Sequence, residues 1–537
     1  MPMTLRPAAM ARAAGANPPA VVRTPSRLAY PRLTAVIFFF VLAIYLLVPV
    51  KDYFFDGIEF AQTNEDSRGL NLFLFHPNHL LYTATGYAMY RAAHALGIPV
   101  RALTLEVLFN TLVSALTAAL MFQVLLAISQ SAYLSTVLAL AFAFSATWWR
   151  YSPNADAYIP AVFFLLLSCF LLLPDRRSRP LALAITHACA MLFHQLAVMF
   201  YPVAVAGLLL QHPDLPLETR VRNAMKYTVV AAAIVIFTYS FVFRVGLGRF
   251  RLGEFMHWLT SHDPAVGFEF NFGRSLSYTI HGTAQLLFAT KASLLGHDLF
   301  SRILLSLATM LAGASVFQLA RHRDELRSAF ASFARADRRL LLLTILWIAV
   351  YLGFLFFWVP ANQHYRPFYA APIILLAAVI VAPAARIVTV RRRYSAALLV
   401  GAFALLNLAL LILPLSREEN TPTLAFAHQM TQFWPRGTVV FYQNYIANVN
   451  NWNMRYFNPQ TDWQQVEPGT LPVSDSELRT IYNSGGTAWF DTSLLELPQW
   501  RTPPFEAWLQ QHTRPGSLHE IPSKGWDIRF LQIFPAR

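Results

Sequence analysis

Charged residues are scarce in this sequence. They make up 13% of the 537 residues, whereas 56% are hydrophobic and the mean hydropathy is +0.43. Soluble globular domains carry about 25% charged residues, so this scarcity excludes an ordinary soluble globule. The composition predicts a multi-pass membrane protein.

Cysteine and lysine are also rare. The two cysteines, Cys169 and Cys189, both lie inside apolar runs, which argues against a disulfide framework or a cysteine metal centre. Only four of the 42 basic residues are lysine, and this bias, with many Ala and Leu residues, fits a GC-rich bacterial genome.

Acidic residues are too few to balance the basic ones, which leaves a formal charge of +14. The basic residues stand in short clusters between apolar runs, as orientation signals of membrane proteins do. This distribution excludes a nucleic-acid-binding surface and predicts the lipid bilayer as the surroundings of the chain.

Long apolar runs account for most of the sequence. A helix needs about 20 apolar residues to cross a hydrocarbon core of about 30 Å. Runs of suitable length lie at 33–50, 103–128, 132–148, 157–173, 226–245, 299–320, 340–359, 367–389 and 395–414. The run 181–210 is too long for one span and is interrupted at His194-Gln195, so we expect two short helices there and about eleven spans in all.

The charge pattern predicts three parts of the chain and their sides of an inner membrane. Residues 1–32, basic and without acids, form a disordered cytoplasmic N-terminus; residues 33–415 form the membrane domain. No small-residue cleavage site precedes Lys51, so the first apolar run is expected to stay as a helix. Residues 416–537 carry a net charge of −2 and form a soluble extracytoplasmic domain.

Within the soluble domain, the patterns at 437–442, 487–492 and 526–534 predict β-strands. The segments 474–483 and 504–512 predict helices. The fold class is therefore mainly α, a polytopic helix bundle with a small C-terminal α/β domain.

The stretch FFDGIEF (54–60) places two carboxylates, Asp56 and Glu59, just after the first span. On a helix they share one face, and an apolar segment (72–90) returns to the membrane beside them. Partial desolvation raises a carboxyl pKa and suits it to general-base work. The alternative is that both acids are solvated interface charges.

Other candidate substrate-binding residues lie in the same set of loops. They are His76, followed by Pro77 and His79; Arg150 and Asp156 in WWRYSPNADAY (148–158); and His364, Tyr365 and Arg366 in the loop 359–372. An arginine such as Arg366 can bind a phosphate bidentately, but it can equally reach lipid headgroups. Asp156 can instead cap a helix. His76 and His79 lack further ligands at the spacing of a zinc site. His194 is a candidate because it interrupts an apolar segment.

The motifs Asp56-Gly-Ile-Glu59-Phe60, His76-Pro77 with Tyr82, and FSATWWRYSPNADAY (144–158) occur together in about residues 30–200. This combination resembles the GT-C glycosyltransferases, and more narrowly the bacterial branch related to protein O-mannosyltransferases. Asp56 matches the catalytic aspartate of that family, Asp156 the acid of its second loop, and His364-Tyr365-Arg366 the late loop that contacts the lipid phosphate. In the usual motifs Ser-Gly stands where Gly57-Ile58 stand here, and Glu where Asp156 stands.

The resemblance implies sugar transfer from a polyprenyl-phosphate donor to a hydroxyl of a protein or glycolipid acceptor, with inversion and with Asp56 as the base. Glu59 or Asp156 would orient Asp56, and Arg366 or Arg150 would stabilise the phosphate. No cofactor is assigned, and a divalent metal bound by Asp56 and Glu59 stays an alternative. The alternative is a polytopic transporter or lipid flippase, which ionisable residues as sparse as His187, His194 and Glu106 near span centres disfavour.

Overall fold

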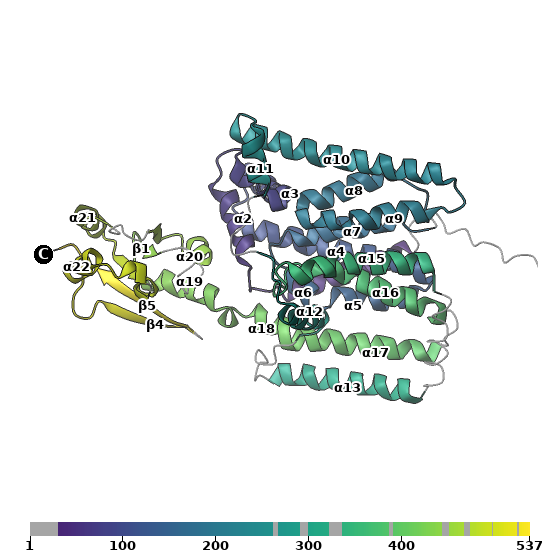
Figure 1. The fold of residues 1–537 in the computed structure, drawn as a ribbon. Coiled ribbons are helices and arrows are strands. Elements are labelled where there is room, and N and C mark those ends of the chain that lie inside the picture. Colours follow the sequence, from purple (N-terminus) through teal and green to yellow (C-terminus); the bar gives the residue numbers. More distant parts are fainter. Residues whose placement is uncertain are drawn as a thin grey trace, which may run out of the picture.

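The computed structural model describes residues 30–174, 176–260, 267–289, 299–321, 336–385, 390–442, 451–466, 473–496, 498–523 and 526–536. They form a helix bundle and a separate C-terminal domain that holds a β-sheet (Figure 1). Of the N-terminus expected to be disordered, residues 1–29 lie outside the described residues. The mainly helical fold class is confirmed.

The bundle helices run side by side and coincide with the apolar runs (Figure 1). They are α1 (Pro31–Leu47), α4 (Ala102–Ser129), α5 (Ala132–Ala143), α7 (Tyr158–Leu171), α8 (Pro180–Phe193), α9 (Tyr201–Gln211), α10 (Leu217–Leu247), α13 (Leu299–Arg321), α15 (Arg338–Phe357), α16 (Pro367–Ala385) and α17 (Val390–Asn407), which continues through a π-helical turn (Leu408–Ile412) into α18 (Leu413–Ser416). Among the described residues, five helices are long and apolar enough to cross a membrane, and six more apolar helices are shorter. The count of about eleven spans stays a prediction.

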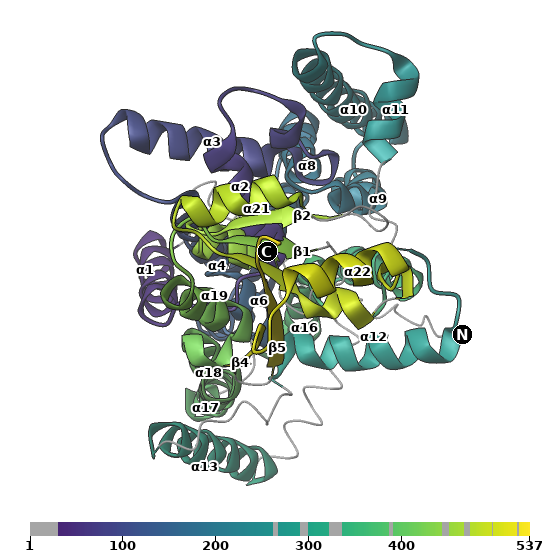
Figure 2. The same ribbon diagram turned by 90° about the vertical axis from the view of Figure 1, so that its left-hand side faces the viewer.

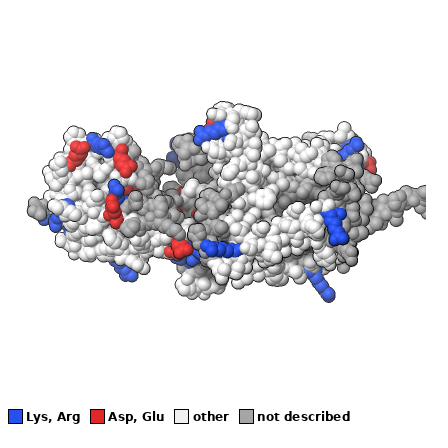
Figure 3. Space-filling model, turned by 90° about the horizontal axis from the view of Figure 1, so that it is seen from below, with Lys and Arg blue, Asp and Glu red and all other residues white. Residues whose placement is uncertain are grey.

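The surface of the bundle agrees with a membrane location. Seen from below, charged side chains gather on the C-terminal domain and towards the two ends of the bundle, and the middle of this face is almost free of them (Figure 3). Many large apolar side chains in the bundle are exposed, among them Phe237 of α10 and Met310 of α13. Such a belt suits a hydrocarbon environment.

The interruption at His194 is confirmed. Helix α8 ends at Phe193 because His194 takes an extended conformation, with φ −155° and ψ 126°. A 3-10 helix, η3 (Gln195–Phe200), then leads into α9. The predicted pair of short helices is therefore present, and the ring of His194 between them lies 6.2 Å from the ring of His79 in the segment 72–90.

Several short elements cover one end of the bundle (Figures 1 and 2). They are α2 (Phe55–Asp66), η1 (Leu72–Leu74), η2 (Pro77–His79), α3 (Leu80–Ala95), α6 (Ala146–Tyr151), α11 (Leu252–Thr260) and α12 (Phe272–Leu287). The amide of Lys51 donates to the carbonyl of Leu415 at 2.8 Å, so the C-terminal domain leaves the bundle at this same end. We call this end of the bundle the domain end. The loops that the charge pattern assigned to one side therefore do gather.

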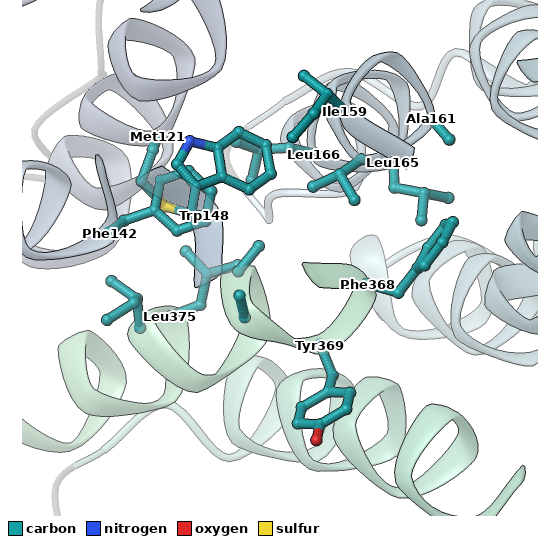
Figure 4. Close-up of a cluster of buried hydrophobic side chains, with 14 of the residues drawn as sticks. Met121, Phe142, Trp148, Ile159, Ala161, Leu165, Leu166, Phe368, Tyr369 and Leu375 are labelled. Carbon is teal, nitrogen blue, oxygen red and sulfur yellow. The ribbon is translucent and has the colours of Figure 1, made fainter. Parts of the chain in front are cut away.

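The core of the bundle lies between α4, α5, α6, α7 and α16 (Figure 4). The Trp148 indole packs on the Phe142 ring, with the ring centroids 4.5 Å apart, and is fully buried. Leu165, Leu166 and Leu375 are fully buried in the same cluster. This close packing fixes α6 and α7, which carry the loop 152–157 between them.

The C-terminal domain has a five-stranded sheet in the order β2-β1-β3-β5-β4. The strands are β1 (Val439–Tyr442), β2 (Asp462–Gln465), β3 (Ala488–Asp491), β4 (Leu518–Ser523) and β5 (Trp526–Ile533), and the helices are α19 (Pro422–Phe433), α20 (Asn451–Phe457), α21 (Asp475–Asn483) and α22 (Pro503–His512). Strand β1 is parallel to β2 and β3, whereas β5 is antiparallel to β3 and β4. The three strands and two helices predicted from sequence are confirmed; the edge strands β2 and β4 have too little apolar character to be seen.

Candidate active site

Asp56 and Glu59 lie on α2, a short helix across the domain end of the bundle. Phe54 is extended and α2 begins at Phe55, so Asp56 stands in the first helical turn, where the helix dipole favours a carboxylate. Both acids line a cavity of about 850 Å³. Burial raises the pKa of Glu59 above its usual value.

The cavity is lined by both polar and apolar residues. The polar ones come mainly from α2, η2, α7 and the turn before η3; they are Asp56, Glu59, Thr63, His76, Asn78, His79, Thr83, Tyr158, His194 and Gln195. The apolar ones include Phe54, Phe55, Phe60 and Phe73 near the acids, and Leu196, Val198, Met199, Phe268, Phe354 and Trp358 from η3, α15 and the segment after residue 266. Val198 and Phe268 are about half exposed. The arrangement suits a ligand with a polar head and a hydrocarbon chain.

Asp156 lies beside Asp56 in a small recess next to the cavity, together with His79 and His194. Its Oδ1 accepts a hydrogen bond from the Tyr158 amide at 2.8 Å, whereas its Oδ2 is buried and has no hydrogen-bond partner among the described residues. Burial raises the pKa of Asp156 well above its usual range, and the charge of Asp56 adds to this effect. Burial therefore favours the protonated form of Asp156.

His76 and His194 are held in the same way. The Nδ1 of His76 accepts from the Asn78 amide at 3.2 Å, and the Nδ1 of His194 accepts from the Leu196 amide at 3.1 Å. Each imidazole thus caps a 3-10 helix, and in the neutral ring the proton is placed on Nε2.

His79 stacks on His76 with ring centroids 4.4 Å apart and lies 6.2 Å from the ring of His194. Burial lowers the pKa of His79 well below its usual value, and His76 and His194 add to this effect. His79 was mentioned with His76 in the sequence but was not among the residues predicted to bind substrate. Its spacing three residues after His76 was the signal that could have included it.

Two of the predicted residues, Arg150 and His364, do not line the cavity. Arg150 forms an ion pair with Asp52, and Asn154 donates to the carbonyl of Asp52 at 2.9 Å. The His364 ring packs between Phe54 and Tyr151, with centroid distances of 3.6 and 4.8 Å. Burial, and then the charge of Arg150, lower the pKa of His364 to about 3, so this ring is neutral.

Arg366 is 2% exposed and forms hydrogen bonds that link three neighbouring segments of the chain. Its guanidinium donates to the carbonyls of Tyr278 and Pro360, at 3.0 and 2.6 Å, and to the hydroxyl of Tyr369 at 2.6 Å. Gly282 of α12 leaves room for it, because a Cβ there would overlap the guanidinium. Arg366 does not line the cavity, whereas its neighbour Tyr365 does.

The structure therefore brings together only part of the predicted set. Asp56, Glu59, His76, His194 and Tyr365 share the cavity, and Asp156 adjoins it. Arg150, His364 and Arg366 stay outside its lining, and no Lys or Arg is among the described residues that line it. Within the described part of the chain, no group of three or more His, Cys, Asp or Glu side chains is arranged to hold a metal ion.

Comparisons with known proteins identify the fold. No family model and no curated protein matches the sequence. Among solved structures, ArnT from Cupriavidus metallidurans bound to undecaprenyl phosphate is similar, with a TM-score of 0.56 and 12% identity over 93% of this chain and 97% of that one. The apo state of the same protein is similar too, with a TM-score of 0.55 and 13% identity over the same shares of the two chains. The chain thus shares the overall fold of these two structures.

Proposed function

We propose that this protein is an integral-membrane glycosyltransferase that moves a sugar from a polyprenyl-phosphate donor to an acceptor hydroxyl at the extracytoplasmic face of the inner membrane. The observation that carries the proposal is the cavity of about 850 Å³, which is lined by Asp56 and Glu59 and by many apolar side chains. The likeness to a structure that binds undecaprenyl phosphate supports it.

The reaction is a single displacement with Asp56 as the base. The Asp56 carboxylate takes the proton of the acceptor hydroxyl while the hydroxyl oxygen attacks the anomeric carbon of the donor. The bond between the anomeric carbon and the phosphate oxygen breaks, and polyprenyl phosphate leaves with the bonding electrons. Attack opposite to the leaving group inverts the anomeric centre.

Asp156 and Glu59 assist Asp56 in different ways. Asp156 is held by the Tyr158 amide, and burial favours its protonated form, which can donate a hydrogen bond to the Asp56 carboxylate and orient it. Glu59 faces the cavity one helical turn after Asp56 and is placed to bind hydroxyl groups of the sugar.

The donor phosphate needs hydrogen-bond donors, and Arg366 is already committed to two carbonyls and a hydroxyl. His194 supplies one instead, because its Nδ1 is occupied by the Leu196 amide and its Nε2 carries the proton. The polyprenyl chain runs along the apolar lining residues past Val198 and Phe268, whose exposure leaves a path to the lipid.

The transferred group in this proposal is a hexose, of the mannosyltransferase type, on the strength of the motif resemblance. The acceptor is a protein or a glycolipid, since both offer a hydroxyl. The motifs of the first two loops support this assignment, and the fold supports only the wider class.

The test is a transfer assay with the full chain in proteoliposomes, labelled undecaprenyl-phosphate sugars and a panel of peptide and glycolipid acceptors. We expect Asp56→Asn to abolish transfer and Asp66→Asn to leave it unchanged, because Asp66 ends the same helix and is exposed. Equal transfer by Asp56→Asn would remove Asp56 as the base. No transfer from any donor, combined with lipid movement across the vesicle membrane, would favour the flippase alternative.

A further inference from the structure

Tyr456 of α20, in the C-terminal domain, is buried against the bundle, and its neighbour Phe457 stacks on Tyr53. Tyr456 is 3% exposed and packs with Ile58 and Ala61 of α2 and with Leu103 of α4. In Figure 1, α20 is the helix of this domain that lies nearest to α2. The ring therefore occupies a pocket between the helix that carries Asp56 and the start of α4.

The Tyr456 hydroxyl closes the N-terminus of α4. The first amides of a helix lack partners within the helix, and the N-cap residue Arg101 does not cap α4 with its own side chain. The Ala102 amide donates to Glu65 Oε1 at 2.8 Å instead, and the Leu103 amide donates to the Tyr456 hydroxyl at 3.1 Å. Residues from α2 and from the C-terminal domain thus cap α4 together.

Glu65 and Arg101 make further contacts between α2, the start of α4 and the C-terminal domain. The Tyr456 hydroxyl donates to Glu65 Oε1 at 2.7 Å, and Arg101 Nε lies 2.8 Å from both oxygens of Glu65. Arg101 also donates to the Tyr456 carbonyl at 3.2 Å, and its guanidinium lies 3.8 Å from the centre of the Tyr456 ring. This is a charge-assisted contact with an added cation–π interaction.

Helix α2 links the contacts of Tyr456 with Glu65 and Arg101 to Asp56. Asp56 stands in the first turn of α2 and Glu65 in its last, and α2 has only 12 residues. A helix of that length has marginal stability unless its neighbours hold it. Tyr456 also shares its apolar cluster with Ala155, the residue before Asp156. Tyr456 therefore packs against both segments that carry the acids, α2 with Asp56 and the loop with Asp156.

We infer that Tyr456 is a positioning residue through which the C-terminal domain holds α2, and so places Asp56 against Asp156. The inference rests on the proposed function for its catalytic readout. The C-terminal domain is then part of the catalytic unit, and full turnover requires that this domain docks on α2 through Tyr456.

The test compares Tyr456→Phe and Tyr456→Ala with wild type in the full chain. A misplacement of reacting groups by about 1 Å can lower turnover by about a hundredfold. We therefore expect kcat to fall roughly tenfold for Tyr456→Phe, which keeps the ring, and roughly a hundredfold for Tyr456→Ala. The KM for the donor is expected to stay unchanged, because Tyr456 does not line the cavity.

Tyr482→Phe is the matched control. Its hydroxyl donates to the Ile533 carbonyl at 2.8 Å, a contact within the C-terminal domain, so this variant should turn over like wild type. Tyr456→Phe combined with Glu65→Ala should lose less activity than the two single losses multiplied together, because both changes remove the hydrogen bond between the Tyr456 hydroxyl and Glu65.

A second measurement does not depend on activity. Hydrogen exchange of the amides in residues 55–66 should be faster in Tyr456→Ala than in wild type and unchanged in Tyr482→Phe. Unchanged exchange, or wild-type kcat in Tyr456→Ala, would overturn the inference. A third outcome separates the two proposals: wild type transfers no sugar, yet exchange is faster in Tyr456→Ala. That outcome would overturn the proposed function and the role of Tyr456 in turnover, but the docking of the C-terminal domain through Tyr456 would stand.

Discussion

Gly57 of α2 lies directly against Ala155, so that a Cβ at position 57 would overlap the Ala155 carbonyl and come within 2.7 Å of its Cβ. The two residues are the neighbours of Asp56 and Asp156 in the chain. The absence of a side chain at position 57 therefore lets α2 approach the loop 152–157 closely enough for the two acids to share one recess.

Gly57→Ala should separate the acids. The added methyl group meets backbone atoms, which cannot turn away as a flexible side chain would, so α2 must shift. We expect kcat in the transfer assay to fall by about a hundredfold. Gly69→Ala is the control, because a Cβ there meets nothing within 4 Å. Wild-type turnover in Gly57→Ala would show that the close approach is not needed.

Asp156→Asn tests the protonation state of Asp156. The folded-state pKa of this carboxyl is raised above its unfolded value, mainly by burial, so the folded state binds the proton more tightly. The free energy of unfolding therefore falls as pH rises from the unfolded pKa, about 3.9, towards the raised folded pKa. Asparagine cannot ionise and keeps an oxygen for the Tyr158 amide.

We expect Asp156→Asn to unfold at a temperature about 2–4 °C higher than wild type at pH 8, with the difference shrinking towards pH 4. Thermal unfolding in detergent at several pH values measures it. A difference that stays constant with pH would mean that Asp156 does not change its protonation on folding.

His194→Ala should weaken binding of the donor phosphate. The substitution removes the Nε2 donor that we assign to the phosphate, and a hydrogen bond to a charged group is worth about 1.5–3 kcal/mol. We expect the KM for the donor to rise roughly tenfold or more, with a smaller change in kcat. His281→Gln is the control, since His281 is exposed and its ring bonds Gln285 one turn away on α12. An unchanged KM in His194→Ala would exclude His194 from the phosphate site.

Arg366→Gln should act on stability and leave donor binding alone. The shorter, uncharged side chain leaves the carbonyls of Tyr278 and Pro360 without their donor, and buried unpaired groups cost about 1–3 kcal/mol each. We expect a lower unfolding temperature and an unchanged KM for the donor in the folded fraction. A raised KM with wild-type stability would return Arg366 to the phosphate site.

Local patterns in the sequence are informative about the elements of this protein. The apolar runs match the bundle helices, and the break at His194 falls where α8 ends. The alternation of basic clusters placed the loops that carry Asp56, Arg150 and His364 at one end, and contacts such as the ring packing of Phe54 on His364 confirm that they gather there. These features follow from hydropathy and charge over neighbouring residues, which is why they could be predicted.

The pairing of side chains was beyond the reach of such patterns. Arginine and histidine in a polar loop read alike as phosphate ligands, yet Arg366 turned towards α12 and His194 towards the cavity. Nothing near Tyr456 in the sequence marks it as a partner of Glu65, which lies 391 residues earlier.

The sequence by itself determined which segments are helices, which end of the bundle holds the polar loops, and that Asp56 opens the first of them, because each depends on local composition and period. Only the tertiary structure decided which residues meet Asp56. That choice depends on the packing of α2 against the loop 152–157, α4 and α20, where a missing Cβ at Gly57 and one hydroxyl from Tyr456 set the distances.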